Sequence, residues 1–300
     1  MTAATTPVTD AAPRFDPRIA RRKLTGTIFL GACVAAIGIL LIALIALLVD
    51  VVTKGVPWLD VGFLTGVPSR RAESAGILPA LVGSLEIALL TGLISVPVGV
   101  AAAIYLEEYA RDTFLTRTLR TNIANLAGVP SIIYGIFGLA IFVRAMGMGK
   151  TPLAAALTLA LLIMPIVIIA TIEALRAVPD SQREGAYALG ATRWQTVRGS
   201  VLPAAAPGIV TGIILAIARA IGEAAPLIVI GAAAFVTFLP TPLEPGFSVL
   251  PIQVFQWASR PQADFQGIAA AAILVMLFLT AVLNVLAIIL RNRLARNIQW

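Results

Sequence analysis

The sequence predicts an all-α membrane protein in which six helices cross the bilayer. Of its 300 residues, 59% are hydrophobic and only 12% are charged, and its mean hydropathy is +0.95. Soluble domains carry about twice this share of charge. The apolar runs are each near the ~20 residues that a ~30 Å hydrocarbon core requires. They cover about 27–50, 79–104, 123–145, 152–174, 205–231 and 267–290.

The basic residues predict how these spans are oriented. Fifteen of the 22 Lys and Arg residues fall in the two terminal tails and in the loops near 105–122 and 175–204, six fall in the other loops, and Arg219 lies inside a span. Because Lys and Arg are enriched in cytoplasmic loops, both termini are predicted to be cytoplasmic. The net charge of +7 therefore reflects membrane topology and does not indicate nucleic-acid binding.

Several classes of chemistry are excluded by composition. The chain has no histidine and one cysteine, Cys33, which excludes Ser–His–Asp catalysis, His-dependent zinc sites and an internal disulfide. Gly149-Lys150-Thr151 is similar to the end of a P-loop, but Arg144 stands where the first glycine is required. We therefore expect no enzymatic activity, metal or cofactor on this chain.

The N-terminal part divides into a tail and a first span. Residues 1–26 are rich in Thr, Ala and Pro and predict a disordered cytoplasmic tail. Residues 27–78 predict the first transmembrane helix and an outer loop. Trp58 in this loop, and Trp257 in the later outer segment 232–266, are typical of residues at the membrane interface. The outer segment is expected to lie on the outer leaflet or dip into it.

Residues 79–291 predict the membrane core, with a cytoplasmic loop at 176–204 and a cytoplasmic tail at 292–300. Glu86 lies in the first span of this core, in apolar surroundings. A carboxylate at this depth is costly. Two interpretations stand: Glu86 pairs with Arg219, or it faces a wet outer vestibule.

The third span contains LAGVPSIIYGIFGL, residues 126–139, in which Pro130 interrupts a membrane helix. Ser131 and Tyr134 offer polar groups at this interruption. A simple kink and a contact with the substrate are both consistent with the pattern.

The loop 184–203 reads EGAYALGATRWQTVRGSVLP and predicts two short helices lying across the cytoplasmic face. Ser181 to Glu184 form a potential capping box. Gly190 is expected to end the first helix in the left-handed conformation, and Thr192 to cap the second. Pro203 then opens the fifth span. An ordinary connecting loop is the alternative.

Small residues recur every four positions along the fifth span, which lets another helix approach closely. We expect this face to pack against a second subunit, and a helix of the same chain is the alternative. The residues are Gly208, Gly212, Ala216, Ala220 and Ala224.

Arg219 and Glu223 lie four residues apart in the same span and therefore share one side of its helix. Ionisable groups deep in a membrane usually pair with each other or line an aqueous path. The two residues predict either a structural ion pair or a site where Arg219 meets an anion while Glu223 holds it.

The loop resembles the cytoplasmic EAA loop of ABC importer permeases, whose pattern is E-A-A, three residues, G, a spacer and L-P. Gly185 replaces the second-position alanine, and Ser200 stands where an aliphatic residue is usual. The resemblance implies that a separate ATPase grips this loop. The implied coupling residues are Glu184, Gly185, Ala186, Gly190, Arg193, Leu202 and Pro203.

Three strings narrow the resemblance to phosphate permeases of the PstA type. ARAIGEAAPL at 218–227 is similar to ARxxGETAPL, with Ala224 in place of threonine, and the strings at 126–139 and 248–258 are also similar. The resemblance implies the type I (MetI-like) ABC importer permease fold in a bacterial inner membrane. It also implies inorganic phosphate as substrate, a PstC-like second permease, a PstB-like ATPase dimer that holds ATP and Mg²⁺, and a PstS-like binding protein outside.

Three other functions are consistent with the residues. One is an ABC permease for sulfate or molybdate. The second is a secondary transporter that works without an ATPase, which should show an internal repeat; the sequence shows no convincing one. The third is a membrane sensor of phosphate status, a role that is compatible with transport.

Overall fold

The computed structural model describes residues 17–232 and 235–296, and its internal contacts divide the chain into two units, Met1–Asp50 and Val51–Trp300. Helix α1, Pro17–Gly55, forms most of the described part of the first unit and has a mean hydropathy of 3.1 in its most apolar window. Residues 17–26 are therefore helical, which corrects part of the predicted disordered tail. Residues 1–16 lie outside the described residues.

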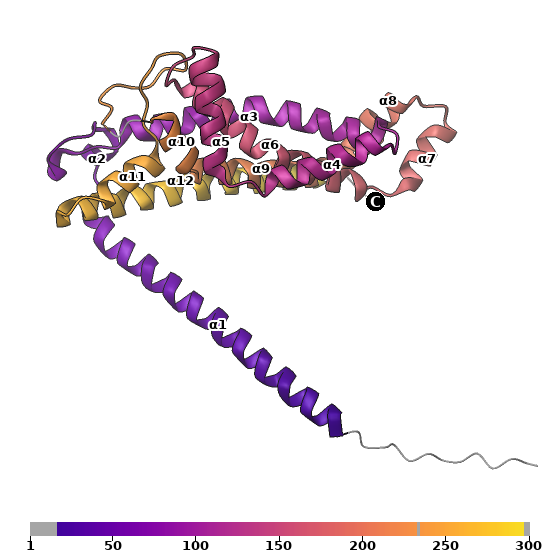
Figure 1. Ribbon diagram of the computed structural model, residues 1–300, viewed down its shortest axis with the longest axis horizontal. Helices are drawn as coiled ribbons and strands as arrows, with labels where there is room; N and C mark the ends of the chain where they lie inside the picture. Colours follow the sequence, from indigo (N-terminus) through magenta and orange to yellow (C-terminus); the bar gives the residue numbers. More distant parts are fainter. Residues whose placement is uncertain (1–16, 233–234, 297–300) are drawn as a thin grey trace, which may run out of the picture. The chain divides into compact units, whose positions relative to one another are not determined.

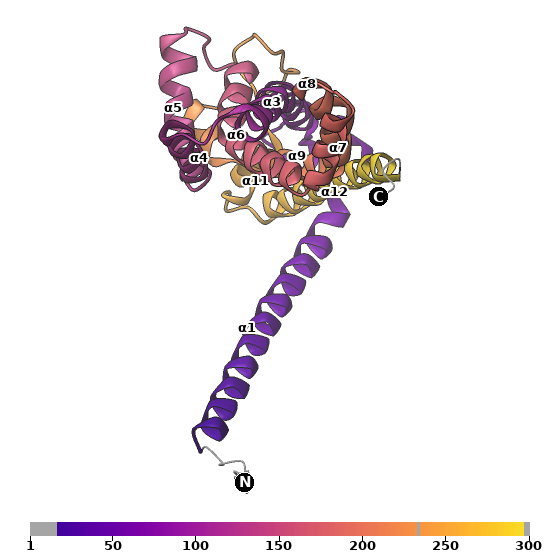
Figure 2. The ribbon, with the colours of Figure 1, turned by 90° about the vertical axis from the view of Figure 1, so that its right-hand side faces the viewer.

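Helices α3, α6, α9 and α12 form the body of the second unit and run side by side (Figure 1). Helix α6 packs against α3 and α9, and α12 packs against α9 at the edge of the bundle in the view along its length (Figure 2). Helices α7 and α8 lie at one end of this bundle, here called the α7–α8 end. The long helices are α3 Leu78–Ile104, α6 Pro152–Arg176, α9 Leu202–Gly222 and α12 Ala263–Arg296.

Shorter elements connect these helices. The α-helices are α2 Val61–Thr65, α4 Phe114–Ala127, α5 Ser131–Gly138, α7 Asp180–Ala188, α8 Arg193–Thr196, α10 Ala225–Ile230 and α11 Leu250–Ala258. The 3₁₀ turns are η1 Val56–Trp58 and η2 Ala72–Ser74, and the π-helical turns are η3 Tyr105–Tyr109, η4 Leu139–Ala145 and η5 Val197–Val201.

Five helices in the described residues are long and apolar enough to span a membrane, and the bent pair of α4 with α5–η4 makes a sixth. The predicted number of spans is therefore confirmed when the bent pair counts as one. Helix α3 begins one residue before the predicted span at 79–104 and ends with it. The side of the membrane that the α7–α8 end faces stays a prediction.

The predicted span at 123–145 is not one continuous helix. The structure bends it by 102° between Ala127 and Ser131. Pro130 has no N–H to donate and disfavours a helical conformation in the residue before it. Helix α4 starts well before the predicted span because the Thr113 side chain accepts a hydrogen bond from the Thr116 N–H.

The predicted fifth span at 205–231 is also divided, since α9 ends at Gly222 and α10 begins at Ala225. Pro203 lies in the first turn of α9, as predicted, although helical structure runs continuously from α8 through η5 into α9. A proline lacks the N–H of a regular helix, and the π-helical turn directly before it absorbs the irregularity.

The outer segment 232–266 packs on the bundle through helix α11, and its position relative to the outer leaflet stays a prediction. Its helix α11 contacts α12 and α3, and the Ser84 hydroxyl accepts a hydrogen bond from the Leu250 N–H at 2.8 Å. Trp257 is only 1% exposed and its ring lies 6.0 Å from that of Phe63. The prediction of Trp257 at the membrane interface is therefore wrong, because its ring fills the core at the end of the bundle.

The C-terminal helix α12 extends into the predicted cytoplasmic tail. Helix α12 continues to Arg296, so the first residues of the predicted tail at 292–300 are helical. Residues 297–300 lie outside the described residues.

Candidate functional site

The loop between α6 and α9 folds into the two short helices that the sequence predicts, α7 and α8. Gly190 joins them with φ +82° and donates its N–H to the Tyr187 carbonyl at 2.9 Å, so its left-handed conformation is confirmed. Thr192 forms a capping box with Gln195, which confirms the second cap. The first capping box is wrong: α7 starts at Asp180, after Pro179, which places Ser181 inside the first turn.

The exposed residues of these helices include Glu184 and three large apolar side chains, Tyr187, Leu189 and Trp194, and these four residues are here called the coupling face. Leu189 is 90% exposed, Trp194 53% and Tyr187 44%. Apolar side chains gathered in a polar surface are typical of a protein interface.

The predicted coupling residues are distributed over this region and the start of α9. Glu184, Gly185, Gly190 and Arg193 are exposed in the chain, Ala186 is half-buried, and Leu202 and Pro203 belong to α9.

The π-helical turn η3 contacts α7 and α8 on one side and α4 and α6 on the other through ion pairs and a cation–π contact. Glu107 accepts hydrogen bonds from Arg120 of α4 and Arg176 of α6, each at 2.9 Å. Glu108, which is 5% exposed, pairs with Arg183 of α7 at 2.8 Å. The Arg193 guanidinium of α8 lies over the Tyr109 ring, 5.2 Å from its centroid.

This cluster was not among the predicted site residues. The available signal was a pair of adjacent carboxylates, Glu107 and Glu108, at the end of an apolar span. Arginines gather in the loop 175–204, which the charge count places on the same side of the membrane. Because both groups lie on the same predicted side of the membrane, the sequence could have predicted ion pairs between these two glutamates and the loop arginines.

The small-residue face of α9 packs against α6 of the same chain. A Cβ added at Gly212 would lie 2.3 Å from the Ala170 Cβ, and one at Gly208 would lie 2.8 Å from the Ala174 Cβ. Ala216 and Ala220 are buried, and Ala224 is half-buried. At Gly212, Ala216 and Ala220 the structure agrees with the alternative, a helix of the same chain, because the close approach that small residues allow is used there within the chain. Gly208 remains exposed, and the contact with a second subunit stays a prediction.

Arg219 and Glu223 lie together at the break between α9 and α10. Arg219 Nε lies 3.2 Å from Glu223 Oε1, with side chains 48% and 17% exposed. The two Nη groups of Arg219 make no hydrogen bond or ion pair with the part of the chain that the structure describes. Because Arg219 is in the last turn of α9, the helix dipole also favours its charge.

The other polar residues of the predicted path lie apart from this pair. Tyr134 is buried with Ala216 and Ala220, and its hydroxyl donates to the Leu126 carbonyl at 2.8 Å across the α4–α5 bend. Ser131 is half-buried at the start of α5. Within the described chain, neither residue makes a hydrogen bond with Arg219 or Glu223.

Glu86 does not pair with Arg219. Both of its carboxylate oxygens are buried and have no hydrogen-bond partner among the described residues. The interpretation as a third member of the Arg219–Glu223 pair is therefore wrong in this structure.

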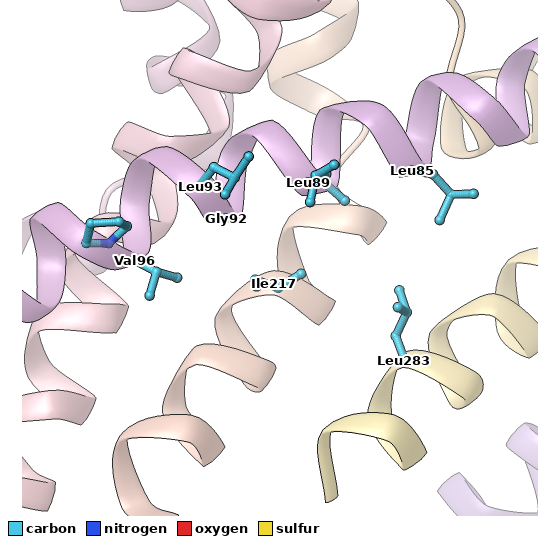
Figure 3. Close-up of a pocket in the computed structure, with 9 residues that line it drawn as sticks. Leu85, Leu89, Gly92, Leu93, Val96, Ile217 and Leu283 are labelled. Atoms are coloured by element: carbon cyan, nitrogen blue, oxygen red, sulfur yellow. The ribbon is translucent and has the colours of Figure 1, made fainter. Parts of the chain in front are cut away.

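A groove of about 590 Å³ between α3, α9 and α12 does not suit an anion. Figure 3 shows its lining, which includes Leu85, Leu89 and Leu93 of α3, Ile217 of α9 and Leu283 of α12. These side chains carry no hydrogen-bond donor, and an anion without donors or counter-charge is strongly disfavoured in an apolar cavity. The groove is therefore not a candidate anion site.

Solved structures identify the fold. A structure described as inward facing conformations of the MetNI methionine ABC transporter matches with a TM-score of 0.61 and 19% sequence identity, over 73% of this chain and 95% of the other. The fold is the MetI-like permease fold of ABC importers, which confirms the predicted fold class.

The family follows from sequence comparison. The chain belongs to the family described as "Binding-protein-dependent transport system inner membrane component", whose model matches residues 95–299. Phosphate transport system permease protein PstA of Yersinia pestis is 38% identical over 245 residues, which cover 81% of this chain and 82% of the relative. Phosphate transport system permease protein PstA 1 of Mycobacterium tuberculosis (strain CDC 1551 / Oshkosh) is 34% identical over 286 residues, 92% of each chain. The predicted family resemblance is confirmed.

Proposed function

We propose that this chain is the PstA-type permease subunit of an ATP-driven phosphate importer. It forms the path for inorganic phosphate through the inner membrane together with a second, PstC-like permease. The relatives that cover most of the chain support this substrate, since they are phosphate transport system permeases.

The observation that carries the proposal is that the Arg219 guanidinium is only partly hydrogen-bonded. Glu223 holds its guanidinium through Nε, while the two Nη groups are left for another partner. A guanidinium presents its N–H groups in a planar fork that matches the oxygens of a phosphate group. The half-exposed side chain lies in the last turn of a membrane-spanning helix, and ionisable groups in such helices usually pair with each other or mark the path of a substrate.

The coupling face supports the involvement of an ATPase. Its exposed apolar side chains and the exposed Glu184 are available to a PstB-like ATPase dimer, on which ATP and Mg²⁺ are bound. A short helix lying in a groove of a soluble partner is a common recognition mode. A PstS-like protein delivers phosphate from the other side. Closure of the ATPase pair moves α7 and α8 and thereby reorients the spans.

The test is uptake of labelled phosphate by cells that lack this chain and receive wild type, Arg219→Gln or Arg219→Lys. We expect wild type to restore uptake, Gln to abolish it, and Lys to give an intermediate rate, since an ammonium keeps the charge but not the planar fork. All three should assemble with their partners in equal amounts. Normal uptake with Arg219→Gln would refute the role of Arg219, and competition of sulfate or molybdate with phosphate would refute the substrate.

A further inference from the structure

The π-helical turn η3 contacts α7, α8, the connecting helix α4 and the bundle helix α6 through three consecutive side chains. Glu107 pairs with α4 and α6, Glu108 with α7, and Tyr109 with α8. The turn continues α3 directly, because α3 ends at Ile104 and η3 begins at Tyr105. π-helical turns are rare and often occur at functional sites.

Arg183 is the most constrained side chain of this cluster. Its Nε and Nη2 donate to Glu108 at 3.3 and 2.8 Å. Nη2 also donates to the Leu175 carbonyl, and Nη1 to the Val178 carbonyl, each at 2.9 Å. Nη1 further donates to Asp180 at 3.3 Å. A guanidinium has five N–H groups, so these contacts use its whole donor capacity.

The two carbonyl groups lie at the end of α6 and directly after it. The last carbonyls of a helix lack intrahelical partners, and a cation at this end is favoured by the helix dipole. Arg183 therefore belongs to α7 by sequence, completes the end of α6, and neutralises the buried carboxylate that follows α3. The hydrogen bond to Glu108 raises the pKa of the Arg183 guanidinium above its ordinary value, so the side chain stays charged.

Movement of α7 relative to α3 would leave this charge pair without its partners. The Glu108 side chain is 6% exposed and that of Arg183 is 16% exposed, so water does not replace the lost bonds without opening the packing. An unpaired buried charge is far more costly than an exposed one. The structure thus favours joint movement of α7, the end of α6 and η3.

We propose that Glu108 and Arg183 are positioning residues that pass the displacement of α7 to α3, so that ATP hydrolysis on the partner is converted into movement of the membrane helices. This inference rests on the proposed function. It assigns no contact with phosphate or with ATP to either residue.

The test uses the complete transporter in proteoliposomes, with the binding protein added outside, and measures phosphate imported per ATP hydrolysed. We expect Glu108→Gln to assemble and hydrolyse ATP while this ratio falls at least ~10-fold, which corresponds to about 1.4 kcal/mol of lost coupling. Arg183→Lys should give an intermediate ratio, because three donors on one nitrogen cannot reach Glu108 and both carbonyls together. The matched control is Asp112→Asn, which removes an exposed pair with Arg117, side chains 80% and 71% exposed, and should leave the ratio unchanged.

A wild-type ratio in an assembled Glu108→Gln complex would overturn the inference. If that variant does not assemble, Arg183→Lys decides, and a wild-type ratio there overturns it equally. A purely structural role would lower import and hydrolysis in parallel with the amount of complex, at constant ratio, and would also overturn it. If wild type imports no phosphate, the proposed function fails. The role of the Glu108–Arg183 pair is then tested separately, by comparing how strongly the binding protein stimulates ATP hydrolysis in wild type and in the variants.

Discussion

Gly212→Ala should destabilise this chain by itself, before any partner binds. The added Cβ would lie 2.3 Å from the Ala170 Cβ, more than 1 Å inside the roughly 3.5–4.0 Å at which carbon atoms pack. Ala170 has no rotamer that moves its methyl group away, so α6 and α9 must separate. Overpacking of this kind costs about 1–3 kcal/mol, and a rigid contact favours the upper end. About 3 kcal/mol corresponds to a fall in Tm of roughly 6–12 °C for a protein of this size.

The assay is thermal unfolding of the purified chain in detergent, with Gly199→Ala as control. A Cβ at Gly199 meets nothing within 4 Å, so that variant should unfold at the wild-type temperature. An unchanged Tm for Gly212→Ala, together with weaker pairing of the two permeases, would refute the packing described above and would return the small-residue face to a subunit interface.

Two further substitutions separate structural from functional roles. Gly190→Val should reduce ATP-driven phosphate import, because a β-branched residue at φ +82° strains the α7–α8 junction by about 1–2 kcal/mol. The control is Gly199→Val, since a Cβ at Gly199 meets nothing within 4 Å. Equal import by the two variants would contradict the reasoning. Tyr134→Phe should lower the Tm by about 2–4 °C, the equivalent of one hydrogen bond of about 1 kcal/mol, and leave the phosphate dependence of uptake unaltered. A changed phosphate dependence at unaltered Tm would instead assign the Tyr134 hydroxyl to the substrate path.

Sequence patterns predict this fold where one local rule dominates. The span at 79–104 was found almost to the residue because its apolar run is long and uninterrupted by charge apart from Glu86. Gly190 was found because only a glycine readily ends a helix with positive φ. Pro130 was recognised as an interruption, but the angle of the bend depends on how α5 packs against α10, which no local rule contains.

The candidate site was less predictable because its contacts are long-range. The spacing of Arg219 and Glu223 is local, and the pair was found. The periodicity of Gly208 and Gly212 correctly indicated a close helix contact. It could not show which helix makes the contact, since α6 and a helix of a second subunit would both need small residues at these positions. Trp257 was misplaced for a similar reason: an aromatic residue near a span suits both the interface and a core.

The pairing of Glu108 with Arg183 also has a consequence for how the chain is made. Seventy-five residues separate the two side chains, and synthesis proceeds at about 5–20 residues per second, so Glu108 emerges roughly 4–15 s before its partner. During this interval the carboxylate must remain hydrated, and the end of α3 cannot adopt its final packing. Arrival of Arg183 then joins three helix ends in one step, those of α3, α6 and α7, so this corner of the bundle packs only after the loop 175–204 has been made.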